Sequence, residues 1–85
     1  MILAIDVGNS NIVLGGLDKN KIHFISRIAT DRQKTENEYA VIMHTIFQMN
    51  GITPNDFEGA IISLVVPSLV STLQNAVKSV IGKTP

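Results

Sequence analysis

A short polar segment follows the first apolar stretch of the chain. Residues 2 to 7 are apolar except for Asp6, and Gly8 and the run Asn9-Ser10-Asn11 come next. The branched side chains predict a buried strand that fixes the position of the Asp6 carboxylate. Gly8 lets the main chain approach a ligand more closely than a residue with a Cβ would, and the amides and hydroxyl add short hydrogen-bond donors. Together with turn N–H groups, these donors are suited to binding a phosphate.

A carboxylate among donors for an anion is explained if a divalent cation joins the two. Magnesium is usually bound by one or two carboxylates together with substrate phosphates. Asp6 is therefore predicted to be the metal ligand, with a nucleotide as the phosphate donor.

A tight hairpin turn is the alternative interpretation of Gly8 to Asn11, because glycine and asparagine are the commonest residues of such turns. Asp6 is not needed for a hairpin. On the apolar side of the turn its carboxylate would also be costly to bury without a partner. The residues alone leave both interpretations open.

The hydrophobic pattern predicts an α/β fold. Strands are expected at 2–7, 12–17 and 22–29 as a three-stranded meander, followed by a helix, a strand at 59–66 and a second helix after Pro67. Thr35 and Glu38 form a capping box that starts the first helix, and Asn50-Gly51 ends it. The unbroken apolar run at 59–66 indicates a strand buried on both faces, with a parallel partner.

Two helical stripes are expected to face the core. The first is Tyr39, Ile42, Met43, Ile46 and Met49, and the second is Leu69, Val70, Leu73, Val77, Val80 and Ile81. Thr53-Pro54-Asn55-Asp56 is typical of a short helical turn, and Gly82 of a helix cap.

Composition restricts the function classes. The chain has 85 residues, 45% of them hydrophobic, a formal net charge of zero and no cysteine. One domain, or part of one, spanning 1–85 is expected. Without a net positive charge, neither nucleic acid nor an anionic membrane is an expected partner. Without cysteines, a basic leader or a long apolar run, we expect a cytoplasmic protein.

The loop also carries a family resemblance. Asp6-Val7-Gly8-Asn9-Ser10-Asn11 with the following Ile12-Val13-Leu14-Gly15 resembles the amino-terminal phosphate loop of type III pantothenate kinases, in the actin-like and sugar-kinase-like superfamily. Arg27-Ile28-Ala29-Thr30, Glu38-Tyr39 and Ile61-Ile62-Ser63-Leu64-Val65-Val66-Pro67 follow in the family's order. The family usually has a second serine at position 64 and often threonine at position 10.

The resemblance implies a ribonuclease-H-like mixed sheet that is the incomplete first half of a two-unit kinase. It implies ATP-dependent phosphorylation of pantothenate to 4'-phosphopantothenate, the first step of coenzyme A biosynthesis, by a homodimer that needs Mg²⁺ and a monovalent cation, K⁺ or NH₄⁺. No catalytic residue is expected in this chain, because the family's aspartate base lies in a Gly-x-Asp-Arg segment beyond residue 85, so the chain alone is expected to be inactive. The implied ATP-binding residues are Asp6, Val7, Gly8, Asn9, Ser10, Asn11, Ile12 and Val13.

Other polar residues have simpler interpretations. His23 and His44 lack partners at catalytic or metal-binding spacing, and Glu36 and Glu38 suit the first turn of a helix. A hydroxyl within an apolar strand needs a partner, and Ser63 is a candidate to line the nucleotide or substrate cleft, near the carboxyl end of its strand. The role of Arg27 is left open. A non-catalytic nucleotide-binding or transcription-accessory module of the same family remains the alternative function.

Overall fold

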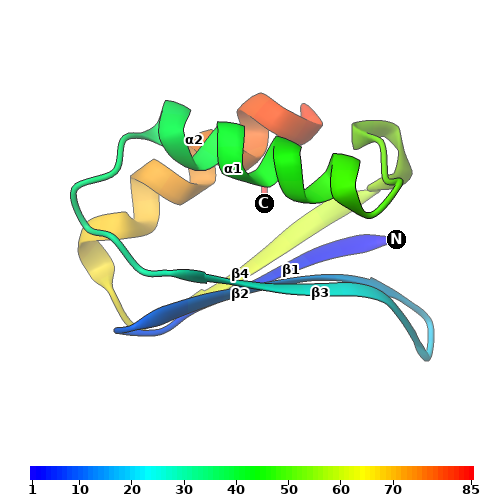
Figure 1. The fold of residues 1–85 in the computed structure, drawn as a ribbon, viewed down its shortest axis with the longest axis horizontal. Coiled ribbons are helices and arrows are strands. Elements are labelled where there is room, and N and C mark those ends of the chain that lie inside the picture. The colour runs from blue at the N-terminus through cyan, green and yellow to red at the C-terminus, as the bar shows by residue number, and fades with distance from the viewer.

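A computed structural model describes residues 1–85 as a four-stranded sheet with two helices. Figure 1 shows both helices on one face of the sheet, while the other face is bare. The predicted fold class, an α/β mixed sheet built as meander, helix, strand and helix, is confirmed. The elements are β1 (Ile2–Val7), β2 (Asn11–Asp18), β3 (Lys21–Ala29), α1 (Glu36–Met49), β4 (Gly59–Leu64) and α2 (Val70–Ile81), with short 3₁₀ turns at Pro54–Asp56 and Pro67–Leu69.

The sheet has the strand order β3-β2-β1-β4. β1, β2 and β3 pair antiparallel as the expected meander. β4 returns beside β1 in parallel, which confirms the predicted parallel partner, and α1 lies in the long connection that such a crossover requires. β1 is thus a central strand with β2 and β4 on its two sides, and the turn that follows it connects it to β2.

The core fills the space between the sheet and the helices. Phe24 from β3, Phe47 from α1 and Phe57 before β4 pack together, with the rings of Phe47 and Phe57 4.9 Å apart between centroids. Leu3, Ile5 and Val7 are the buried face of β1. Because side chains alternate along a strand, Asp6 is directed to the bare face.

The ends of the helices follow the predicted local signals. The Glu38 N–H donates to Thr35 Oγ1 and the Thr35 N–H donates to Glu38 Oε1, at 3.2 and 2.9 Å, so the capping box is confirmed. Hydrogen bonds to its carboxylate, first from the Thr35 backbone N–H and then from the Thr35 side chain, hold the pKa of Glu38 below its ordinary value. Gly51 and Gly82 have φ of +68° and +73° at the ends of α1 and α2, the left-handed conformation that glycine adopts without strain.

The predictions for Met49 and for the strand at 59–66 are wrong. Met49 is 80% exposed, and Phe47, at 1%, takes its place in the core stripe, because the buried positions 39, 43 and 47 repeat every four residues and Met49 lies farther around the helix. β4 ends at Leu64 rather than at residue 66, and it is not buried on both faces. Ile61 is 64% exposed, because both helices cover the opposite face of the sheet.

Candidate functional site

The turn between β1 and β2 is compact around Gly8. The Gly8 N–H donates to the Asn11 carbonyl at 2.8 Å, and a Cβ built on Gly8 would lie 3.2 Å from that oxygen. A side chain at this position would therefore need the neighbouring main chain to move by a few tenths of an ångström, so the turn favours glycine. The turn is indeed a β-hairpin, as the alternative interpretation holds, but hairpin geometry does not prevent its outer side from binding an anion.

Three donor-bearing side chains, Asn9, Ser10 and Asn11, are exposed on this turn. Val7 and Ile12 are fully buried, so they can contribute to a ligand site only through the main chain, and the Val7 carbonyl already accepts from the Val65 N–H. Val13 is half-buried on the bare face.

The sequence predicted that the Asp6 carboxylate lies on the buried, apolar side of the turn, and this prediction is wrong. The carboxylate is exposed on the bare face, because Ile5 and Val7 take the two adjacent core positions. It takes part in none of the salt bridges or side-chain hydrogen bonds of the chain. Its oxygens are therefore free to bind a ligand or a cation.

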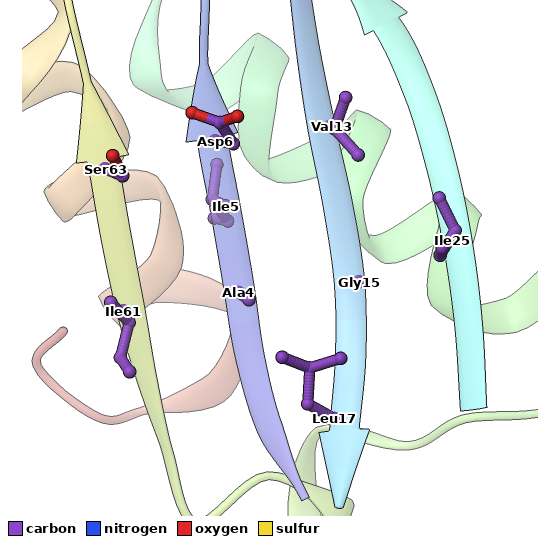
Figure 2. A pocket seen from close by; sticks show the side chains of 9 residues that line it. All are labelled: Ala4, Ile5, Asp6, Val13, Gly15, Leu17, Ile25, Ile61 and Ser63. Carbon is purple, nitrogen blue, oxygen red and sulfur yellow. The ribbon is translucent and has the colours of Figure 1, made fainter. Parts of the chain in front are cut away.

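A row of four side chains crosses the bare face at the level of Asp6. The strand register pairs Asp6 with Ser63 on β4 and with Val13 on β2, and Val13 with Arg27 on β3. Ser63 and Arg27 are exposed, so the Ser63 hydroxyl needs no partner within the chain, contrary to the sequence argument. It does lie beside the carboxylate near the carboxyl end of β4 (Figure 2).

Below this row the sheet carries a shallow hollow of about 260 Å³. Ala4 and Gly15 lie at its centre, and Leu17, Ile25 and Ile61 stand around them (Figure 2). This part of the face is apolar and offers nothing to a phosphate. The polar chemistry is restricted to its upper edge, where Asp6 and Ser63 lie.

The connection between β3 and α1 supports the turn from outside. Thr30 Oγ1 donates to the Gly8 carbonyl at 2.8 Å, and the Thr30 N–H donates to the Ser10 carbonyl at 2.9 Å. Arg32 Nη2 donates to Asn9 Oδ1 at 3.1 Å. Neither Thr30 nor Arg32 was predicted as a site residue, although Thr30 belongs to one of the segments that carry the family resemblance.

The connection is itself held by the core. Tyr39, fully buried on α1, donates its hydroxyl to the Asp31 carbonyl at 2.6 Å, and the Asp31 N–H donates to the Tyr39 hydroxyl at 3.0 Å. Tyr39 thereby fixes the segment that supports the turn.

The donor set fits magnesium in one particular way. No group of three or more histidine, cysteine or acidic side chains is close enough to hold a metal ion. A single free carboxylate beside a turn with several hydrogen-bond donors would instead suit a cation that is held mainly by substrate phosphates and water. Asp6 is the residue that would bind it.

Fold and turn together define an α/β unit whose central hairpin presents a carboxylate and amide donors at one edge of the sheet. A sequence model of the type III pantothenate kinase family matches residues 2–85, and the chain belongs to this family.

Relatives named type III pantothenate kinase match the whole chain. Those of Shouchella clausii, Geotalea uraniireducens and Finegoldia magna are 43%, 42% and 40% identical to it. The matched region is 34%, 33% and 32% of their respective lengths, so the chain spans about a third of these relatives.

No helix of the structure has the length and hydropathy that crossing a bilayer requires.

Proposed function

We propose that the protein containing this chain transfers the γ-phosphoryl group of ATP to pantothenate, giving 4'-phosphopantothenate in the first step of coenzyme A biosynthesis. This chain would supply the loop that binds the ATP phosphates. The observation that carries the proposal is the free, exposed Asp6 carboxylate beside a turn with three exposed donor side chains. The names of the relatives support the choice of pantothenate as acceptor.

In phosphoryl transfer the protein mainly positions groups and stabilises charge. Gly8 allows the phosphates to come close to the main chain, and Asn9, Ser10 and Asn11 donate hydrogen bonds to their oxygens. Magnesium, when bound, would neutralise phosphate charge, and Asp6 would hold it directly or through water. The main chain of Val7, Ile12 and Val13 completes the proposed ATP-binding segment.

Further parts of the proposal depend on residues outside this chain. They are the general base, the pantothenate pocket, a site for K⁺ or NH₄⁺, a homodimer and a cytoplasmic location. Because phosphoryl transfer needs a base to accept the proton of the attacking hydroxyl, the 85-residue chain alone is proposed to be inactive.

The test compares two aspartate variants of the full-length protein. Asp6→Asn is expected to lower kcat/KM for ATP by ~100-fold or more, measured as ADP formation that depends on pantothenate. Asp18→Asn is the matched control, because Asp18 is also exposed on the sheet but lies at the far end of β2, with its carboxylate 3.6 Å from His23. Its activity is expected to match that of the unsubstituted protein.

Two results would contradict the proposal. If Asp6→Asn retains full activity, the loop does not carry the phosphate chemistry. If the unsubstituted protein binds an ATP analogue but forms no ADP with pantothenate, the alternative holds, namely a non-catalytic nucleotide-binding or transcription-accessory module.

A further inference from the structure

Arg32 is the cationic side chain that directly contacts the turn at Gly8 to Asn11. Its Nη2 donates to Asn9 Oδ1 at 3.1 Å, and its side chain is exposed. A guanidinium group has five N–H donors in a planar fork, and this hydrogen bond uses one of them. The others remain available on the solvent side of the turn.

The same contact determines how Asn9 presents its amide. The amide oxygen is the only acceptor of the Asn9 side chain, and it would repel a phosphate oxygen. Because Arg32 occupies that oxygen, the two N–H donors of Asn9 are the part left for a ligand. Arg32 and Asn9 therefore present their free N–H donors side by side.

The neighbouring cations are placed differently. Lys34 Nζ lies 3.8 Å from the Asp31 carboxylate, within the same connection. Arg27 is on the bare face of β3, and the β2 residue Val13 separates it from Asp6 in the strand register. Neither makes a hydrogen bond to the turn.

The backbone that carries Arg32 is well anchored. Two Thr30 hydrogen bonds tie it to the turn on one side, and the Asp31–Tyr39 pair of hydrogen bonds ties it to the core on the other. An arginine on such a support can meet a phosphate with little further loss of backbone freedom.

We propose that Arg32 is a phosphate-binding residue of the nucleotide site, whose guanidinium contacts the phosphate oxygens of a nucleoside triphosphate and keeps the Asn9 donors directed to them. This inference rests on the proposed function of the loop. It adds to the site a residue from the β3–α1 connection, next to Asn9 on the turn that follows Asp6. The positive charge of Arg32 would compensate the negative charge of the phosphates that one bound magnesium ion does not neutralise.

The test measures steady-state kinetics of the full-length protein with Arg32→Gln, Arg32→Lys and, as a matched control, Lys34→Gln. Lys34→Gln removes the same charge two residues away without removing a contact to the turn. Arg32→Gln is expected to raise KM for ATP about tenfold or more, the loss typical of a charge-assisted hydrogen bond, and to leave KM for pantothenate nearly unchanged. The KM for ATP of Arg32→Lys should lie between the values of the unsubstituted protein and of Arg32→Gln, because lysine keeps the positive charge but lacks the planar fork of donors.

A second measurement does not depend on turnover. A nonhydrolysable ATP analogue with Mg²⁺ should raise the Tm of the unsubstituted protein and of Lys34→Gln, and raise that of Arg32→Gln much less at the same concentration. The Tm without ligand shows whether each variant folds. If Arg32→Gln does not fold, the comparison of Arg32→Lys with the unsubstituted protein provides the test.

The inference is overturned if KM for ATP is unchanged in Arg32→Gln, or if Lys34→Gln raises it equally, since a general charge effect would then suffice. Failure of the proposed function itself is distinguishable. In that case Asp6→Asn also leaves activity and analogue binding intact, whereas failure of the Arg32 proposal alone leaves the Asp6→Asn defect in place.

Discussion

Asp6 and Ser63 are register partners on the adjacent parallel strands β1 and β4, and both are exposed on the same face of the sheet. Segments 57 positions apart in the sequence thus bring a carboxylate and a hydroxyl together at the edge that also carries the Gly8 turn. This relationship widens the candidate site from one loop to two strands.

Ser63→Ala tests whether the hydroxyl belongs to the site. Because Ser63 is exposed, the free energy of unfolding is expected to change by less than ~0.5 kcal/mol. KM for ATP in the full-length protein is expected to rise about threefold, the loss of one weak neutral hydrogen bond. Ser71→Ala, an exposed serine on α2, is the control. Equal KM values for both variants would remove Ser63 from the site.

Gly8→Ala tests the compactness of the turn. The added Cβ would lie 3.2 Å from the Asn11 carbonyl, so the turn must shift, and we expect a loss of about 1 kcal/mol in unfolding free energy together with weaker ATP binding. In the control Gly59→Ala the nearest atom is 3.9 Å away, in ordinary contact. Denaturant titration and analogue binding check both. If Gly8→Ala is as stable as Gly59→Ala and binds the analogue equally well, the turn accommodates a Cβ and the expectation is contradicted.

The bare sheet face predicts the behaviour of the 85-residue chain in isolation. Ile25 and Ile61 are 62% and 64% exposed beside the apolar hollow, and a contiguous apolar surface of this kind promotes association. The mass measured by analytical ultracentrifugation is expected to rise with concentration. Ile25→Lys should reduce this association, whereas Val41→Lys, at an equally exposed position on α1, should not. A monomer at all concentrations would contradict this expectation.

Glu38 predicts a pH dependence of stability. Hydrogen bonds from Thr35 lower its pKa from the ordinary value of 4.5, so the ionised form is favoured in the folded protein. Its contribution is therefore fully present above the unfolded pKa and is lost as the pH falls through the lower, folded pKa. The stability advantage over Glu38→Gln, measured by denaturant titration, should shrink as the pH is lowered from neutrality through this range. An advantage independent of pH would contradict the capping role of the charge.

The sequence was sufficient where the responsible residues are close together in the chain. The capping box of Thr35 and Glu38 and the glycine ends of both helices were predicted because each depends on chemistry within a few residues. The exposure of Asp6 and Ile61 was not predicted, because it depends on which face of the sheet the helices cover.

The same distinction applies to the site. The residues of the Gly8 turn were visible as one contiguous segment. The contacts from Thr30 and Arg32 span 22 and 23 positions and follow from the pairing of β3 with β2, which no local pattern reveals. Thr30 alone gave a signal, as a hydroxyl directly after an expected strand within a segment that resembles the family.

The backbone amides of Gly8 to Asn11 provide the most direct measurement of the central claim. In the isotopically labelled full-length protein, an ATP analogue with Mg²⁺ should shift these NMR signals. The shifts should weaken when Mg²⁺ is omitted and disappear in Asp6→Asn. Signals that stay in place, or that move equally in Asp6→Asn with and without Mg²⁺, would contradict a phosphate site built on this carboxylate.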